Sequence, residues 1–414
     1  MISITDKSKC CGCAACAQKC PKQCISMEYD AEGCEYPVVN VDQCVDCGLC
    51  EKACPVLNVD NDEPKSQRAF LVQHDDQKVL AESTSGGAFT ALAQAVIANG
   101  GIVFGAGYLR GEQLVRAEGA PGRLKVGHFS VESVDELWRF RNSKYVQSVV
   151  GPAYPEVKQQ LKTGREVLFI GTPCQCEGLL RFLGGKPANL RVADFVCHAN
   201  PARAVFARQV EWLDAKIGVK GETVLFRDKS LFGYRYSNTC ELEGETLDGE
   251  RLYSEGVETD PYLRAFFADL SDRPICYECP FKKRYRVTDL TCWDFFDVYR
   301  LSKEFDDNRG VTRVLIQSDE GQELLDRASS YARMKEIDVE AAVEGARELT
   351  KSVKLNPRRD EFMADVANLD GEELMNKWFP DSGKVKAERF ARHTCEKLGI
   401  YDPMKRLVKK IIKK

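Results

Sequence analysis

Cysteine spacing near the start of the chain sets the strongest constraint on its chemistry. Two segments follow the same pattern, C-x2-C-x2-C-x3-C-P, and their cysteines are Cys10, Cys13, Cys16, Cys20, Cys44, Cys47, Cys50 and Cys54. Three cysteines at this spacing wrap a short loop around one cubane, and the fourth points away to the other cluster. The pattern therefore predicts two [4Fe-4S] clusters. The predicted ligand sets are Cys10, Cys13, Cys16 and Cys54 for one cluster, and Cys44, Cys47, Cys50 and Cys20 for the other.

Zinc and disulfides are the alternatives for such a cysteine-rich segment. Zinc sites also use C-x2-C pairs, but zinc ribbons rarely combine three cysteines at this spacing with Cys-Pro. Disulfides are typical of secreted chains, whereas the first residues, Met1 to Lys7, lack the apolar stretch of a secretory signal. We therefore expect a cytoplasmic protein whose cysteines bind metal. Cys11, Cys24 and Cys34 lie outside the pattern, and the sequence assigns them no role.

Composition excludes several other classes of protein. The net charge of -4 argues against a nucleic-acid-binding protein, which usually carries a basic excess. Hydrophobic residues make up 43% and charged residues 29%, as in a soluble globular protein. No apolar run is long enough to span a membrane. A length of 414 residues predicts two or three folded units.

The order of motifs predicts the domain organisation. We expect a ferredoxin-type domain over residues 1–58, a polar linker over 59–67, a body over 68–335 and a helical C-terminal region over 336–414. In the body, the apolar runs 102–108, 166–171 and 190–198 predict strands, and 88–98, 176–183 and 201–213 predict helices. The alternating segment 223–253 predicts an antiparallel insertion. The fold class is thus α/β and α+β.

Two further cysteines follow predicted parallel strands, where ligands of such sheets bind. Cys174 and Cys197 occupy these positions, and Cys276 and Cys279 form a later C-x2-C pair. Together these four thiolates would suffice for a third [4Fe-4S] cluster. Counting alone leaves the set open, because Cys176, Cys240 and Cys292 are possible substitutes.

A second kind of site is indicated where Ser85, Gly86 and Gly87 precede the predicted helix over 88–98. Free backbone amides and the helix dipole favour a phosphate at such a position. The same residues also serve as ordinary helix caps, so this feature alone is a weak signal.

Seven short motifs in order make the body resemble the coenzyme F420 hydrogenase/dehydrogenase beta-subunit family. The resemblance extends from about Arg68 to Phe362, behind the fused ferredoxin segment. The motifs that carry it are Ser85–Thr90, Lys144–Ser148, Gly171–Gln175, Asp194–His198, Cys276–Cys279, Asp289–Thr291 and Asn356–Arg358.

The resemblance implies a flavin-binding body that contains FAD and a third [4Fe-4S] cluster on Cys174, Cys197, Cys276 and Cys279. It also implies that residues around the flavin come from several of these motifs. The predicted flavin-binding residues are Ser85, Gly86, Gly87, Lys144, Gln147, Ser148 and Thr172. Relatives either exchange electrons with the deazaflavin coenzyme or reduce an organic substrate, and similar bacterial members are often tied to surface-polysaccharide synthesis.

We therefore expect an FAD- and iron–sulfur-dependent oxidoreductase. A ferredoxin-like or other one-electron donor would pass electrons through the clusters to FAD and on to a small organic substrate. The alternative is an electron-transfer beta subunit that couples the clusters to a deazaflavin coenzyme or a partner dehydrogenase. His198 and Tyr145 are candidate proton donors by position, although His198 would equally serve as a hydrogen-bonding neighbour of Cys197.

The last ten residues, Lys405 to Lys414, combine an apolar helical face with six cations. Such a pattern favours peripheral contact with an anionic membrane surface, and a solvated tail is the alternative. The sequence leaves the oligomeric state open.

Overall fold

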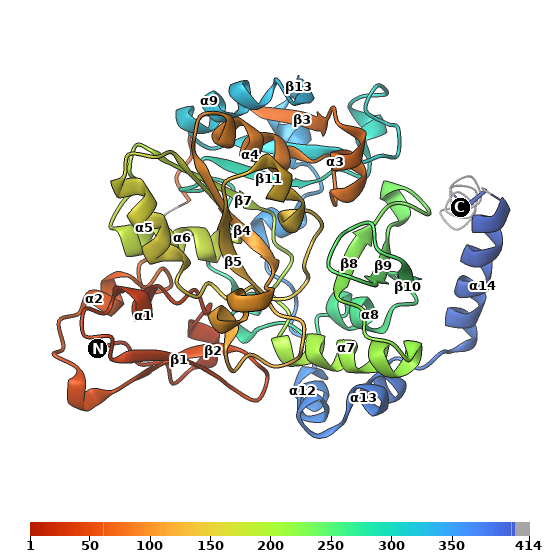
Figure 1. Cartoon of the computed structure of the whole chain (residues 1–414), viewed down its shortest axis with the longest axis horizontal. Coiled ribbons are helices and arrows are strands. Elements are labelled where there is room, and N and C mark those ends of the chain that lie inside the picture. The colour runs from red at the N-terminus through yellow and green to blue at the C-terminus, as the bar shows by residue number, and fades with distance from the viewer. Residues whose placement is uncertain (61, 399, 402–414) are drawn as a thin grey trace.

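The computed structural model describes residues 1–60, 62–398 and 400–401. The N-terminal segment folds as a compact unit (red in Figure 1) in which two cysteine loops flank a hairpin. The loops lead into α1 (Ala15–Lys19) and α2 (Leu49–Lys52), and the hairpin joins β1 (Ile25–Tyr29) to β2 (Glu35–Val39). Two short 3-10 turns, Lys7–Lys9 and Val41–Gln43, precede the loops.

The two cysteine loops turn in the same way. The residue before the second cysteine has a positive φ in both, at Gly12 (67°) and Asp46 (47°). The residue after that cysteine does as well, at Ala14 (58°) and Gly48 (70°). These turns let successive cysteines face inward, as ligation of one compact cluster requires.

One mixed eight-stranded sheet forms the body. Its order is β13-β3-β12-β11-β7-β6-β4-β5, with β4, β6, β7 and β11 parallel and the outer strands antiparallel. The strands are β3 (Ala69–His74), β4 (Ile102–Tyr108), β5 (Val126–Val131), β6 (Val167–Gly171), β7 (Leu190–Phe195), β11 (Leu290–Asp294), β12 (Thr312–Ile316) and β13 (Ala332–Ile337).

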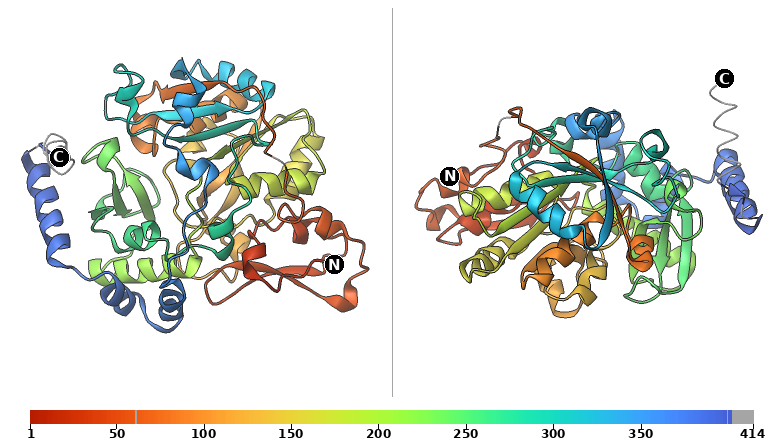
Figure 2. Two further views of the ribbon diagram at one scale, coloured as in Figure 1. Left: turned by 180° about the vertical axis from the view of Figure 1, so that it is seen from behind. Right: turned by 90° about the horizontal axis from the view of Figure 1, so that it is seen from above.

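Alternating side chains of the central strands supply two cores, one on each face of the sheet. On β6, Phe169 faces a core shared with α5 (Ala153–Lys162), α6 (Pro173–Leu183) and the first cysteine loop. Leu168 faces the other core, beneath α4 (Ala88–Ala98) and α9 (Asp319–Ala328). The N-terminal domain is therefore packed on the α5/α6 side of the sheet, as Figure 2 also shows.

A second, antiparallel sheet stands beside the first (green in Figure 1). It contains β8 (Thr223–Asp228), β9 (Asn238–Leu242) and β10 (Arg251–Gly256), and it is packed on α7 (Arg203–Ile217) and α8 (Pro261–Phe267). The C-terminal helices then cover α7 and the outer edge of this sheet. They are α12 (Arg359–Asn368), α13 (Gly371–Trp378) and α14 (Gly383–Leu398).

Short elements complete the chain between these units. They are α3 (Gln77–Glu82), α10 (Val339–Val343) and α11 (Arg347–Thr350), with 3-10 turns at Gly111–Ala117, Val134–Phe140, Tyr234–Tyr236, Pro274–Glu278 and Val298–Arg300. In the part of the chain that the structure describes, no helix has the length and apolar character of a membrane span.

The mixed α/β architecture and the antiparallel insertion confirm the expected fold class at this level. One expected boundary differs, because β13 continues to Ile337 and crosses the limit placed at residue 335. β13 belongs to the body because it pairs with β3, a long-range contact that local periodicity does not encode. Residues 62–67 of the expected linker lie against the body, where Lys65 donates to the Arg286 carbonyl at 2.6 Å. The basic tail over 405–414 lies outside the described residues.

Candidate iron-sulfur centres

Cysteines of both repeats meet in the N-terminal domain in the crossed manner that the spacing predicts. Cys20 of the first repeat lines one cavity together with Cys44, Cys47 and Cys50 of the second. Burial raises the pKa of Cys16 to about 12, and the Cys10, Cys54 and Cys50 thiols add to this rise. Cys13 lies beside Cys16 and Cys10 in turn. Cys24 lines the first cavity as well, and all of these thiols are free of disulfides, so they are available as cluster ligands; the two ligand sets stay a prediction.

The four body cysteines line a second cavity at the carboxyl edge of the sheet. Cys174 begins α6 directly after β6, and Cys197 follows the neighbouring parallel strand β7. Cys276 and Cys279 come from the 3-10 turn over 274–278 and the residue after it. Of the cysteines that counting left open, Cys176, Cys240 and Cys292 do not line this cavity. The donor set of four thiols fits a third cubane cluster, which stays a prediction.

Thr172 and Pro173 position Cys174 at the start of α6. Thr172 is the N-cap, and its hydroxyl donates to Gln175 Oε1 at 2.9 Å while its amide donates to the same oxygen at 3.2 Å. Pro173 occupies the first helical position, where a missing N–H costs nothing. The Gly-Thr-Pro-Cys-Gln motif is therefore a strand-to-helix turn that aims one thiol into the cavity.

Cys11, which the sequence left without a role, lines the same cavity as the body cysteines. The thiol of Cys11 lies between two others, because it interacts with both Cys13 and Cys174. Its carbonyl accepts a hydrogen bond from Gln147 Nε2 at 2.8 Å. Gly178 of α6 permits this approach, since a Cβ there would lie 3.0 Å from Cys13 Sγ. The first cysteine loop thus reaches the edge of the body cavity.

Three arginines of the body hold the N-terminal domain in place. Arg273 is fully buried and donates to the carbonyls of Cys10 at 2.8 Å and Glu35 at 2.6 Å. Arg203 forms a buried ion pair with the Glu35 carboxylate at 2.8 Å. Arg359 binds Glu32 at 2.6 Å. Because these partners lie on the hairpin and the first cysteine loop, the domain has one fixed orientation on the body.

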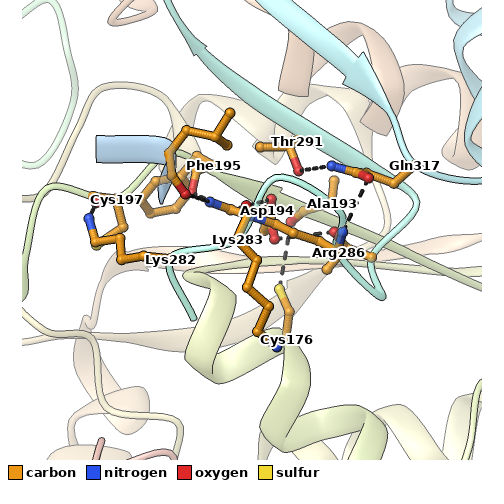
Figure 3. A network of polar contacts seen from close by, with 12 residues as sticks. Cys176, Ala193, Asp194, Phe195, Cys197, Lys282, Lys283, Arg286, Thr291 and Gln317 are labelled. Carbon is orange, nitrogen blue, oxygen red and sulfur yellow. Dashed lines mark hydrogen bonds and ion pairs between the residues drawn. The ribbon is translucent and has the colours of Figure 1, made fainter. Parts of the chain in front are cut away.

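A buried polar network supports the cavity from the sheet side (Figure 3). Asp194 of β7 pairs with Arg286 at 3.0 Å, and both side chains are at most 2% exposed. Asp194 also accepts from Thr288 at 3.1 Å, and Arg286 itself lines the cavity. Nearby, Lys283 pairs with Glu177 of α6 at 2.9 Å. Asp194, the first residue of the Asp194–His198 motif, therefore holds the Arg286 guanidinium beside the cysteines.

His198 and Tyr145, the predicted proton donors, belong to one aromatic cluster around Phe266. The His198 ring lies 4.8 Å from that of Phe266, and the Tyr145 ring lies 5.0 Å from it on another side. His198 Nε2 contacts Asp269 Oδ1 at 3.0 Å, and burial lowers the pKa of His198. Only His198 lines the body cavity, so the structure does not bring the two groups to one site.

The predicted flavin residues Ser85 and Lys144 come from segments that meet, because Thr84 Oγ1 and Ser143 Oγ lie 2.9 Å apart. Ser85 Oγ donates to the Val311 carbonyl at 2.6 Å, and the Gly86 amide donates to Thr312 Oγ1 at 2.9 Å. A Cβ on Gly86 would meet the Val72 carbonyl oxygen at 2.2 Å, so close packing of strands already accounts for this glycine. Gly87 is the left-handed N-cap of α4.

The remaining predicted flavin residues also make hydrogen bonds within the chain. Lys144 Nζ donates to the Arg141 carbonyl at 2.7 Å, and burial lowers the pKa of Lys144 to about 7. Ser148 Oγ accepts from Gln175 Nε2 at 3.0 Å. Gln147 binds the Cys11 carbonyl, and Thr172 caps α6. Each residue of this group has a hydrogen-bond partner within the chain, and FAD binding by the residues named from the sequence stays a prediction.

Comparisons with known proteins agree with the two halves of this description. Residues 164–342 match the C terminus of the coenzyme F420 hydrogenase/dehydrogenase beta subunit, and residues 9–58 match the 4Fe-4S dicluster domain. Ferredoxin-1 of Caulobacter vibrioides is 31% identical over 83 residues, which are 20% of this chain and 69% of that protein. A ferredoxin of Mycobacterium bovis is 36% identical over 72 residues, 17% of this chain and 53% of that protein.

A chain from the F420-reducing [NiFe] hydrogenase complex of Methanosarcina barkeri aligns over 77% of this chain and 92% of its own length. Its TM-score is 0.42 and its identity is 15%. The segments that match the two family models together span the cysteine repeats, both strand-end cysteines and the later C-x2-C pair. The chain therefore contains a 4Fe-4S dicluster domain followed by a C-terminal domain of the coenzyme F420 hydrogenase/dehydrogenase beta-subunit family, and is an iron–sulfur electron-transfer protein of the oxidoreductase kind.

Proposed function

We propose that the chain is an electron-transfer subunit with three [4Fe-4S] sites in series. It would pass single electrons between a donor at the N-terminal domain and a redox partner or deazaflavin coenzyme at the body. The observation that carries this proposal is the shared cavity. Cys11, beside the predicted ligand Cys13, lines the same cavity as the body thiols, so the first cysteine loop and the third site adjoin.

The ends of this series differ in their access to solvent. Cys47 of the outer set is exposed, and the neighbouring Val45 is 58% exposed, so a donor can reach this end. Cys13, Cys174 and Cys276 are buried, which keeps water away from the inner sites. An iron–sulfur cluster, when bound, takes up and releases one electron at a time. The residues of this chain contribute ligation, insulation and fixed spacing.

Cations at the body cavity suit a cluster with four thiolate ligands, which carries net negative charge. Arg286 lines the cavity and is held by Asp194 at 3.0 Å. Lys282 also lines it and donates to the His198 carbonyl at 3.0 Å. Positive charge at this depth favours the reduced, more negative state and so raises the reduction potential.

Reduction of a small organic substrate through FAD, and a role in surface-polysaccharide synthesis, remain predictions from the sequence. The residues named for FAD make hydrogen bonds within the chain in this ligand-free structure. Flavin content in the experiment below tests this prediction directly.

The decisive experiment is anaerobic purification followed by iron, sulfide and flavin analysis per chain. Three cubanes predict about 12 irons, since each contains four. Cys276→Ser should lower iron to about 8, because it removes one ligand of the body cavity. Cys292→Ser is the matched control, because Cys292 is equally buried but lies in the core of the sheet. It should keep about 12 irons.

A wild-type value near 8 irons that Cys276→Ser leaves unchanged would overturn the three-site series. One FAD per chain would restore the flavoenzyme alternative. Iron at about 12 without flavin would support the electron-transfer subunit.

A further inference from the structure

Three ligand-type side chains gather outside the cluster sites. They are His198, Asp269 and Asp272, and their donor atoms all lie within 4.8 Å of one another. A bridge between Pro201 and Asp272 joins the segment after β7 to the turn after α8. The Ala202 amide donates to the Ser271 carbonyl at 2.7 Å within this bridge. The main chain therefore fixes the three side chains against one another.

The Asp272 carboxylate is buried without a partner for its charge. Its side chain is fully buried, and among the described residues neither carboxylate oxygen has a hydrogen-bond partner. An unpaired buried charge costs several kcal/mol, in rough terms, so the carboxylate needs a cation or a proton.

The cationic side chains around Asp272, Arg359 and Lys282, donate their hydrogen bonds to other acceptors. Arg359 donates to the backbone carbonyl of Asp272 at 2.8 Å and to the Glu32 carboxylate at 2.6 Å. Lys282 donates to the carbonyls of His198 and Glu348, both at 3.0 Å. Neither side chain donates a hydrogen bond to the Asp272 carboxylate oxygens. The charge of this carboxylate can therefore be balanced only in the space between Asp272, Asp269 and His198.

We infer that His198, Asp269 and Asp272 bind a divalent transition-metal ion. One imidazole nitrogen and two carboxylates form a donor set for Mn²⁺, Fe²⁺ or Zn²⁺. Bonds of about 2.0–2.2 Å place neighbouring ligand atoms roughly 3–4.5 Å apart. The His198 Nε2 to Asp269 Oδ1 distance of 3.0 Å and the 4.8 Å limit for the whole group are compatible with this.

The site has a route for the ion. The side chains of His198 and Asp269 are 23% and 22% exposed, whereas Asp272 forms the closed end. Water can complete the coordination on the open side. The inference does not depend on the third cluster, although an ion beside Cys197 would add positive charge near that site.

A proton is the competing occupant. Burial raises the pKa of Asp272 well above its ordinary value, so a neutral carboxylic acid would also relieve the cost. A site for a metal ion would bind added Mn²⁺, whereas a protonated Asp272 would not, so a metal titration distinguishes the two cases.

The test is titration of the full iron-loaded chain with Mn²⁺, with the clusters oxidised, followed by EPR. Hydrated Mn²⁺ gives a sharp EPR signal that is lost on binding, and hard Mn²⁺ discriminates against thiolate sites. The wild type should bind about one Mn²⁺ per chain. Asp272→Asn and Asp269→Asn should each weaken binding at least about tenfold. Asp135→Asn, which changes an exposed acid on the 3-10 turn over 134–140, should bind as the wild type does.

Either of two results would overturn the inference. One is no saturable Mn²⁺ binding by the wild type, which would assign Asp272 to the neutral acid. The other is equal binding by the wild type and both site variants. Asp272→Asn keeps the shape of the side chain, and Asp269→Asn changes a partly exposed residue. Iron content at the wild-type value verifies folding in each variant.

Discussion

Replacing Arg273 by methionine should detach the N-terminal domain from the body. Arg273 is 0% exposed, and its guanidinium donates to Cys10 O at 2.8 Å, Glu35 O at 2.6 Å and Gln147 Oε1 at 3.1 Å. It also lies over the Tyr36 ring at 4.4 Å. Methionine keeps much of the apolar stem but leaves three buried acceptors without their donor.

The magnitude follows from those three bonds. Hydrogen bonds from a charged donor contribute about 1.5 kcal/mol each at the lower end of their range, giving roughly 4–5 kcal/mol. This agrees with the cost of about 3–5 kcal/mol for removing one partner of a buried charged network. At about 2 °C per kcal/mol for a chain of this size, the unfolding midpoint should fall by roughly 8–10 °C.

The assay is thermal bleaching of the iron–sulfur absorbance at one fixed scan rate, together with limited proteolysis of the 59–67 segment. Arg300→Met is the matched control, because Arg300 is half-exposed and its partner Glu344 is exposed. An exposed pair of this kind contributes about 0–1 kcal/mol, so the control should shift by less than about 2 °C. If Arg273→Met behaved like Arg300→Met in both measurements, the buried arginine would not hold the domain, and this reasoning would be wrong.

Three further predictions test the cavity and its surroundings. Cys11→Ala should keep the wild-type iron content, because Cys11 lies outside the four predicted body ligands; loss of about four irons would make it a ligand. Asp194→Asn should destabilise the chain by roughly 3 kcal/mol, measured by denaturant unfolding, because it leaves buried Arg286 without a charged partner. Burial raises the pKa of Asp260 to about 7, so the folded chain binds the extra proton below that pH, and the stability from this group is lost as pH rises through 7. Asp260→Asn keeps the helix cap, so its free energy of unfolding, relative to that of the wild type, should rise by about 2 kcal/mol from pH 5.5 to pH 8. A difference that stays constant across that range would contradict the buried-acid interpretation.

Local spacing determined the features that depend on neighbouring residues. Cluster loops need cysteines at short, fixed intervals, so the two repeats predict both N-terminal sites. They also predict that Cys20 of the first repeat lies with the cysteines of the second. The apolar runs that became β6 and β7 predicted that Cys174 and Cys197 would share one edge, because parallel neighbours end together.

Only the tertiary structure decided which distant residues complete each site. Cys11 looked like any small buried residue until packing of the first loop on α6 brought it to the body cavity. Ser85 and Lys144 belong to motifs far apart in the sequence, and only the tertiary structure brings their segments together, with Thr84 Oγ1 2.9 Å from Ser143 Oγ. Asp272 carries no local signal at all. Its buried carboxylate without a hydrogen-bond partner and its bridge to Pro201 result from long-range contacts that no spacing in the sequence encodes.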